Sequence, residues 1–431
     1  MRVLILATDI FTRGGIARYT STLASSLGKL LGPENVDVLC FFDWGNTGES
    51  PSDFRVLGMV SSRQGAGVGS RLQFLAKALR AGASGYDLVI ANHVALAPVA
   101  ALLKLAFGIP YWVACHSIEI WWGTTRARHA SLKKADLILP ISRYTADVIQ
   151  HRKGIDRQRV KVLYNAIPEE LAQELVRDTK PPTQAKEASS PTNTKLALVG
   201  VPASTPTSTK PALVGGPAGM GHSTTPLLLS VCALVRGNEF KGIDTVIEAL
   251  PRVLQSVPDL QYVVVGEGEI RAKLERFAVK AGVAANVKFV GEVTDSELVE
   301  LYRSCDAFVL PSRGQQLRGA IGGEGFGRVY VEAALAGKPV ISSCAGGAAE
   351  AVLDGRTGFL VDPTSVDDVA EAVLALFTNR ERAAAMGAAG RKWARQMFSQ
   401  EALMESLQYL LRPYGFEQRA RLQLVHAGGK R

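Results

Sequence analysis

The segment EGFGRVYVEAALAGKP (324–339) combines residue types that could hold a phosphorylated sugar. Gly325 and Gly327 flank Phe326 directly before a predicted helix over 328–336, and a glycine loop at a helix N-terminus presents backbone N–H groups to an anion. Glu324 precedes this helix and Glu332 lies inside it, so two carboxylates could accept hydrogen bonds from sugar and ribose hydroxyls. A helix with a solvated glutamate face does not explain EGFG before an apolar helix, so we predict a site for a phosphate and a polyol.

Two other features could serve the same chemistry. Gly14 and Gly15 open a predicted helix after the first apolar run, where backbone amides could approach an anion, although the spacing is not that of a dinucleotide fingerprint. His116 ends the apolar run PYWVACH (110–116), at the carboxyl edge where open parallel sheets bind ligands. Glycine pairs and single histidines are also common in purely structural settings. From these residues alone both interpretations stay open.

The elements that must position these residues are short apolar runs alternating with helical stretches, first over 1–175 and again over 226–394. This alternation is typical of parallel sheets covered by helices on both faces, so we predict two doubly wound α/β domains. Residues 176–225 are rich in Pro, Thr, Ser, Gly and Lys, and TNTKLALVGVPA (192–203) is nearly repeated as TSTKPALVGGPA (207–218). We interpret this segment as a low-complexity linker. Helices over 380–411 and a charged tail end the chain.

Composition narrows the class of protein. The 431 residues are 47% hydrophobic and 21% charged, which suits two globular domains. Five widely spaced cysteines without a C-x-x-C pair argue against a disulfide framework or a zinc module, and we expect a reducing, cytoplasmic compartment. The N-terminus does not read as a signal peptide, and no run of apolar residues is long enough to span a membrane. Residues 1–161 hold 20 basic and 11 acidic residues, so the whole net charge of +9 lies there and indicates an anionic partner.

The chain resembles the family 4 glycosyltransferases, retaining nucleotide-sugar transferases with the GT-B fold of two Rossmann-like domains facing a cleft. The residues that carry the resemblance span nearly the whole chain outside the linker: Gly14-Gly15, HSIEIW (116–121), SRYT (142–145), Lys241-Gly242, VGEG (265–268), EGFG with Glu332, and GGAAEAVLDGRTGFLVDP (346–363). The resemblance implies an acceptor domain over 1–175, a donor domain over 226–394, and C-terminal helices over 395–431 that cross back to the first domain.

The resemblance also implies roles for single residues. Gly15 would face the donor diphosphate from the N-terminal domain, His116 would contact the donor sugar near the reacting centre, and Lys241 would hold the diphosphate. Glu324 would bind sugar hydroxyls and Glu332 the ribose. The three residues His116, Glu324 and Lys241 are the predicted catalytic set. The predicted donor-binding set is Gly14, Gly15, Arg236, Lys241, Gly266, Gly325, Phe326, Gly327 and Glu332.

Two positions depart from the family pattern. Many relatives carry an arginine eight residues before the lysine of KG, and here that position is Ala233. Arg236 could substitute for it from a shifted loop, or the phosphate clamp is weaker by roughly 1.5–3 kcal/mol, the worth of one charge-assisted contact. Ser117 follows His116 where glycine is common, which crowds the turn.

Two segments have alternative interpretations. The glycine-rich loop 313–324 could fold over the donor as a lid or be a surface loop. The segment RLQFLAKALR (71–80) places Leu72, Leu75, Ala76 and Leu79 on one helical face, either toward the core or toward an acidic membrane. The basic N-terminal part favours the membrane.

The function expected from the resemblance is transfer of a mannose- or glucose-type hexose from a GDP- or UDP-sugar to a glycan or lipid-linked acceptor, with retention at the anomeric carbon. No D-x-D motif is present, and we expect no cofactor, no strictly required metal and no nucleic-acid partner. Peripheral contact with the cytoplasmic membrane face fits the charge. The alternatives are a non-catalytic nucleotide-sugar-binding subunit, for which Ala233 speaks, and another GT-B enzyme such as a sugar-phosphate synthase or a phosphorylase.

Overall fold

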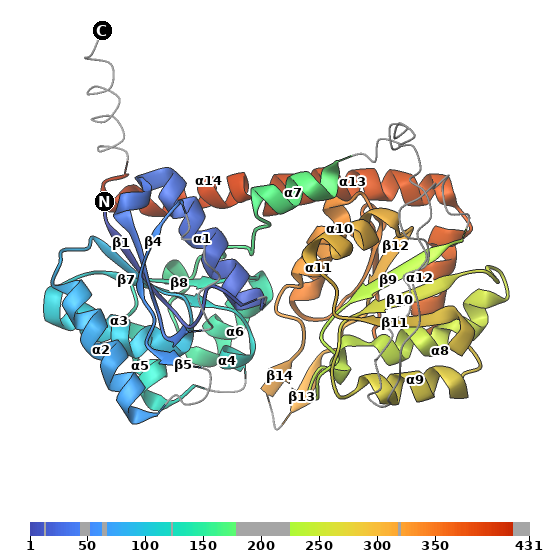
Figure 1. Cartoon of the computed structure of the whole chain (residues 1–431), viewed down its shortest axis with the longest axis horizontal. Helices are drawn as coiled ribbons and strands as arrows, with labels where there is room; N and C mark the ends of the chain where they lie inside the picture. Colours follow the sequence, from blue (N-terminus) through green and yellow to red (C-terminus); the bar gives the residue numbers. More distant parts are fainter. Residues whose placement is uncertain are drawn as a thin grey trace, which may run out of the picture.

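The computed structural model describes residues 1–12, 14–43, 52–62, 67–121, 124–177, 225–317 and 320–416. These residues form two α/β domains that lie side by side, with the N- and C-terminal parts of the chain meeting along one side of the molecule (Figure 1). The predicted linker 176–225 and the charged tail lie almost entirely outside the described residues.

The N-terminal domain is built on a six-stranded parallel sheet with the order β4-β2-β1-β6-β7-β8. Its strands are β1 (Val3–Ala7), β2 (Val36–Cys40), β4 (Arg55–Gly58), β6 (Leu88–Ala91), β7 (Tyr111–Cys115) and β8 (Leu137–Pro140). Every residue of β1, β2, β6 and β7 is buried, because helices cover both faces of the sheet. This explains why the strands read as continuous apolar runs and not as alternating patterns.

The helices of this domain are α1 (Gly15–Leu31), α2 (Val68–Gly82), α3 (Ala97–Phe107), α4 (Ile118–Trp121), α5 (Arg126–Lys134), α6 (Arg143–Lys153) and α7 (Glu169–Val176). A short parallel pair, β3 (Phe42–Asp43) and β5 (Ser61–Ser62), lies beside the main sheet. The helix α2 turns a different face to the core than the sequence suggested. Its buried residues are Phe74, Ala78 and Gly82, whereas Leu72 is 61% exposed and Ala76 is also exposed.

The C-terminal domain repeats the same architecture, with the strand order β11-β10-β9-β12-β15-β16. Its strands are β9 (Leu227–Val231), β10 (Gln261–Val265), β11 (Val287–Gly291), β12 (Ala307–Leu310), β15 (Val340–Ser343) and β16 (Gly358–Val361). Its helices are α8 (Ile243–Leu254), α9 (Arg271–Lys280), α10 (Asp295–Ser304), α11 (Arg328–Leu335), α12 (Val366–Phe377) and α13 (Arg380–Phe398). Thr294 and Glu297 form a capping box at the start of α10.

Both sheets have the strand order of a doubly wound fold, in which the first three strands are added toward one edge of the sheet and the last three toward the other. The point where the order switches lies between β1 and β6 in one domain and between β9 and β12 in the other. Loops that leave these strands diverge and open a crevice at the carboxyl edge of the sheet, where ligands bind in folds of this kind. Functional side chains are therefore expected just after β1, β6, β9 and β12.

The two domains are joined by polar and helical contacts. The helix α14 (Gln400–Leu411) follows α13 and returns to the N-terminal domain, where it lies along α1 (Figure 1). The Gln400 amide donates hydrogen bonds to Ser25 Oγ and Ser26 Oγ at 3.1 and 3.2 Å. Trp112 donates to the Tyr414 hydroxyl at 3.0 Å. These contacts fix the end of the chain to the first domain.

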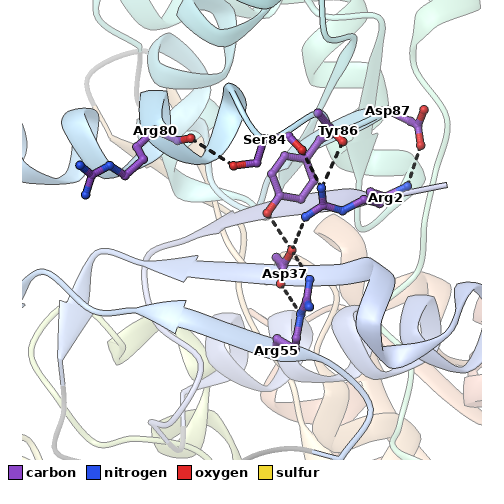
Figure 2. A network of polar contacts seen from close by, with 8 residues as sticks. Arg2, Asp37, Arg55, Arg80, Ser84, Tyr86 and Asp87 are labelled. Carbon is purple, nitrogen blue, oxygen red and sulfur yellow. Dashed lines mark hydrogen bonds and ion pairs between the residues drawn. The ribbon is translucent and has the colours of Figure 1, made fainter.

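A buried carboxylate stabilises the edge of the N-terminal sheet opposite the crevice (Figure 2). Asp37 on β2 is fully buried and accepts hydrogen bonds from Arg55 Nε and Nη2 at 2.8 and 2.9 Å and from the Tyr86 hydroxyl at 2.7 Å. Arg2 lies 3.4 Å away and stacks over the Tyr86 ring. A buried charge is tolerated only where such partners satisfy it.

We expect Asp37→Ala to destabilise the protein by about 2 kcal/mol, because it leaves the Tyr86 hydroxyl buried without an acceptor and removes a charge-assisted network. The free energy of unfolding in urea, followed by circular dichroism, measures the change. Asp367→Ala is the matched control, since Asp367 pairs with Arg252 at the surface and is 80% exposed. Equal midpoints for Asp37→Ala and the wild type would contradict the structural role given to this network.

Candidate active site

Lys241 and Glu324 meet at the switch point of the C-terminal domain. Lys241 ends the short helix Glu239–Lys241 after β9, and Glu324 ends the loop 313–324 that follows β12. Their side chains form an ion pair, and they are only 16% and 13% exposed. Arg313, at the start of the loop 313–324, donates its backbone N–H to the Phe240 carbonyl at 2.6 Å and so ties the two loops together. The structure thus brings together two of the three predicted catalytic residues.

The EGFG loop lies directly against the N-terminal domain. Gly327 caps the N-terminus of α11 with a φ of 82°, a backbone conformation that residues other than glycine rarely adopt. A Cβ atom on Gly325 would lie 2.8 Å from the His116 carbonyl oxygen and 2.9 Å from Ser117 Cβ. The glycines therefore allow the loop to turn and the two domains to touch at His116.

His116 follows β7 and is buried at 5% exposure. Its Nε2 lies 2.8 Å from the Asn92 carbonyl oxygen, so Nε2 carries the proton and Nδ1 is left as the acceptor of a neutral ring. Burial lowers the pKa of His116, while the Glu119 carboxylate acts in the opposite direction. The Tyr19 ring packs edge-on against the imidazole at 4.9 Å between centroids. This geometry holds His116 as a neutral hydrogen-bonding group.

Glu119 positions the turn that carries His116. Its carboxylate accepts hydrogen bonds from the backbone N–H groups of both His116 and Ser117, the latter at 3.1 Å. The Ser117 side chain is accommodated beside Gly325. Glu119 is therefore occupied with backbone groups and acts through the conformation of the turn.

Glu332 is buried inside α11 at 4% exposure. The Tyr302 hydroxyl of α10 donates to Glu332 Oε2 at 3.0 Å, and Arg328 Nη2 lies 3.4 Å from Glu332 Oε1. Burial raises the pKa of Tyr302 well above its ordinary value, so the hydroxyl stays a donor. The carboxylate is held in one orientation by a tyrosine and an arginine.

The other predicted donor-binding residues have varied surroundings. Gly14 caps α1, and a Cβ on Gly15 would meet no atom within 4 Å, so space is left at the start of that helix. Packing requires a glycine at position 266, since a Cβ atom on Gly266 would lie 1.9 Å from the Cys232 carbonyl oxygen. The Phe326 ring is buried against Tyr164 and Phe398. Arg236 is exposed on the loop after β9, and its backbone N–H donates to Glu269 at 3.2 Å.

Sequence reasoning missed three features of this region. The loop 313–324 contains a β-hairpin of β13 (Gln315–Leu317) and β14 (Ala320–Gly322), with β14 beside α4 of the other domain (Figure 1). Glu350 spans the domain boundary, and Tyr302 holds Glu332. Glu350 lies in the GGAAE segment noted in the sequence, but nothing local shows that its partner is in the other domain.

Family models match both domains. A model described as "Glycosyltransferase Family 4" matches residues 13–171, and one described as "Glycosyl transferases group 1" matches residues 223–393. The two matched segments leave out the low-complexity linker. The chain belongs to the family 4 glycosyltransferases.

Curated relatives of this glycosyltransferase include the GDP-mannose-dependent alpha-(1-6)-phosphatidylinositol monomannoside mannosyltransferase of Mycobacterium tuberculosis, 42% identical over 184 residues. A GDP-mannose-dependent monoacylated alpha-(1-6)-phosphatidylinositol monomannoside mannosyltransferase of Corynebacterium glutamicum is 37% identical over 171 residues. These alignments cover 42% and 40% of this chain, and 47% and 44% of the relatives. The chain thus matches about half the length of these relatives.

Solved structures confirm the GT-B fold. Anabaena Alr3699/HepE in complex with UDP and glucose superposes with a TM-score of 0.68 at 19% identity, covering 96% of this chain and all of that one. Sucrose-phosphate synthase from Thermosynechococcus elongatus has the same TM-score and identity, with coverage of 96% and 99%. At such identities the likeness concerns the fold.

Among the described residues, no helix is both long and apolar enough to cross a bilayer. No group of three or more His, Cys, Asp and Glu side chains in this part of the chain is arranged to hold a metal ion.

The burial of His116 predicts a pH-dependent stability. Its pKa is lowered in the folded state, as is that of the neighbouring His93, so the unfolded chain binds more protons below the ordinary histidine pKa of about 6.5. Stability is then lost as the pH falls through that value, by up to about 1.4 kcal/mol per pH unit for each histidine. We expect the melting temperature to fall between pH 7.5 and 5.5, and less so in His116→Gln.

The exposed His151 provides the matched control variant, His151→Gln. Equal pH slopes for His116→Gln and the wild type would show that His116 is not held neutral by the fold.

Proposed function

We propose that the chain is a retaining hexosyltransferase that uses a nucleoside-diphosphate sugar and a glycan or lipid-linked acceptor. The observation that carries the proposal is the Lys241–Glu324 pair at the switch point of the C-terminal domain, next to the loop that touches His116. The pair offers a cation for a phosphate and a carboxylate for sugar hydroxyls in one partly buried place. Family membership supports the same reaction class.

In this proposal the protein stabilises the leaving diphosphate. The bond between the anomeric carbon and the phosphate oxygen breaks, while the acceptor oxygen bonds to the same face and its proton passes to the departing phosphate. The ammonium of Lys241 and the N-terminus of α11 supply positive charge where negative charge develops. The protein itself provides this charge, so we expect turnover to persist in EDTA.

Two side chains orient the donor. The neutral Nδ1 of His116 is suited to accept a hydrogen bond from a sugar hydroxyl near the anomeric carbon, and it cannot act as a fixed cation. Glu332 Oε1, only weakly engaged by Arg328, is suited to a ribose hydroxyl. Glu324 then binds hydroxyls of the sugar while Lys241 turns to the phosphate.

We propose mannose from GDP-mannose as the first donor to test and a phosphatidylinositol-type lipid as the first acceptor. The activities for which the M. tuberculosis and C. glutamicum relatives are named support this choice, and the similarity covers about half of each of those proteins. Anabaena Alr3699/HepE, which shares the fold, was solved in complex with UDP and glucose, and this supports including UDP-glucose in the same panel.

We expect Glu324→Ala and Lys241→Ala each to lower kcat by about a hundredfold or more, because each removes a preorganised charged group from the reacting centre. The release of nucleoside diphosphate from a panel of donors with the lipid acceptor measures the effect. Glu371→Ala and Lys280→Ala are matched surface controls and should retain full activity. Wild-type kcat in both site variants would contradict the assignment.

The same preparations separate an enzyme from a binding subunit. Calorimetry with GDP, UDP and ADP identifies the nucleotide, and Glu332→Ala should weaken its binding. Slow hydrolysis of the bound donor in the absence of acceptor supports an enzyme. Tight binding without any hydrolysis or transfer would favour a non-catalytic subunit.

We also propose that the N-terminal domain binds an anionic membrane from the cytoplasmic side. On α3, Leu102, Leu105 and Phe107 are 43%, 83% and 41% exposed, and on the adjacent α2, Val68 and Leu72 are 73% and 61% exposed. The basic helix α5, which holds Arg126, Arg128, Lys133 and Lys134, packs beside α3 (Figure 1). Exposed apolar residues next to basic ones fit the interface of an acidic bilayer.

The five unpaired cysteines, all in described segments, support a reducing compartment.

We expect the double variant Leu72→Ser/Leu105→Ser to lose most of its binding to vesicles that contain phosphatidylglycerol, because it removes the two most exposed leucines of this surface. Co-sedimentation with such vesicles and with pure phosphatidylcholine vesicles measures the loss. Val279→Ser, which changes a 67% exposed residue of the C-terminal domain, is the control. Vesicle binding that is unchanged in the double variant would place the membrane contact elsewhere.

A further inference from the structure

Arg328, the first residue of α11, is a buried arginine with few partners. Its side chain is 8% exposed, and its only hydrogen bond among the described residues runs from Nη2 to Glu332 Oε1 at 3.4 Å. Within the same residues Nε and Nη1 have no acceptor. Buried guanidinium groups are normally satisfied through several N–H donors, so this side chain is prepared for an acceptor that the protein itself does not provide.

A second arginine adds positive charge from the other domain. Arg18, in the first turn of α1, acts electrostatically on Arg328 and forms its own ion pair with Asp295 at 2.9 Å. Burial is the main cause that lowers the pKa of Arg328, Glu332 opposes it, and the charge of Arg18 lowers it further. Two guanidinium groups from different domains thus act on one another, and of the two carboxylates that pair with them only Glu332 is buried.

The backbone strengthens this positive region. Both α1 and α11 begin after a glycine, have no side-chain cap and carry no acidic residue in the first turn. Each has an arginine there instead, although the helix dipole disfavours a cation at an N-terminus. Two uncapped helix N-termini and two arginines together form a region that favours an anion.

Resting on the proposed function, we propose that Arg328, assisted by Arg18, binds the diphosphate of the donor nucleotide. Arg328 would thereby replace the arginine that many relatives have at the position of Ala233. Glu332, the candidate ribose ligand, lies four residues further along α11, about 6 Å along the helix axis, and its carboxylate is 3.4 Å from the Arg328 guanidinium, so one nucleotide can contact both side chains. Ala233 and Arg236 are both exposed on the loop after β9, and neither provides a buried cation.

Calorimetry on the full chain tests the proposal with three probes: a nucleoside diphosphate that the wild type binds, its nucleoside, and inorganic pyrophosphate. In Arg328→Met we expect affinity for the diphosphate and for pyrophosphate to fall about ten- to a hundredfold, the worth of one charge-assisted contact. Affinity for the nucleoside should stay within about twofold, since the base and ribose contacts remain. Arg328→Lys should restore part of the loss, and Arg18→Met should weaken binding in the same direction.

Thermal unfolding by circular dichroism accompanies each titration. Arg328→Met should melt no lower than the wild type, because the substitution removes a poorly satisfied buried charge. Arg252→Met, at a surface ion pair between α8 and α12 of the same domain, is the matched control for loss of an arginine. Arg236→Met tests the alternative that Arg236, and not Arg328, replaces the arginine missing at Ala233.

The outcomes separate this proposal from the proposed function. Unchanged diphosphate affinity in Arg328→Met, equal losses for nucleoside and diphosphate, or a large loss in Arg236→Met instead would overturn the role of Arg328 alone. A wild-type chain that binds no nucleoside diphosphate and no pyrophosphate would overturn the donor assignment, and with it the proposed transferase.

Discussion

The contact between Glu350 and the N-terminus of α6 sets the relation between the two domains. The Glu350 carboxylate accepts hydrogen bonds from the backbone N–H groups of Arg143 and Tyr144 at 2.8 and 2.9 Å, and from the Tyr164 hydroxyl at 3.1 Å. A carboxylate at a helix N-terminus also gains from the helix dipole. Because Glu350 belongs to the C-terminal domain and the other three residues to the N-terminal one, this contact holds the two sheet edges at a fixed separation.

That separation determines the geometry of the EGFG loop. With the domains so placed, Gly325 packs against the His116 carbonyl, and Phe326 lies in an aromatic cluster with Tyr164 and Phe398 at centroid distances of 5.6 and 5.1 Å. Tyr164 therefore takes part in both the polar and the aromatic contact. The loop that carries Glu324 is thus supported from beneath by side chains of both domains, which fits a site that must hold a donor rigidly.

The sequence was sufficient for the two α/β domains and for placing Lys241 and Glu324 in one site, because the first depends on local pattern and the second on a known family arrangement. It was insufficient for the core face of α2. The helical periodicity of α2 favoured its leucines as the buried face. In the structure Gly82 packs closely against Leu103 and Phe107, and this contact turns the face with Phe74 and Ala78 toward the core. Contacts between domains, such as Arg18 with Asp295, depend on tertiary placement and leave no local pattern.

The charges of the site are divided unequally, and this division fits the chemistry. On the side that we propose for the diphosphate lie Lys241, Arg328, Arg18 and two helix N-termini, with Glu324 and Glu332 as the proposed acceptors for hydroxyls. On the side that we propose for the sugar, His116 is neutral and Glu119 is engaged by backbone N–H groups. Such an arrangement stabilises a departing diphosphate without offering a free carboxylate nucleophile at the His116 turn. A reaction in which the leaving group itself takes the acceptor's proton needs this distribution, because its barrier falls with stabilisation of the developing phosphate charge.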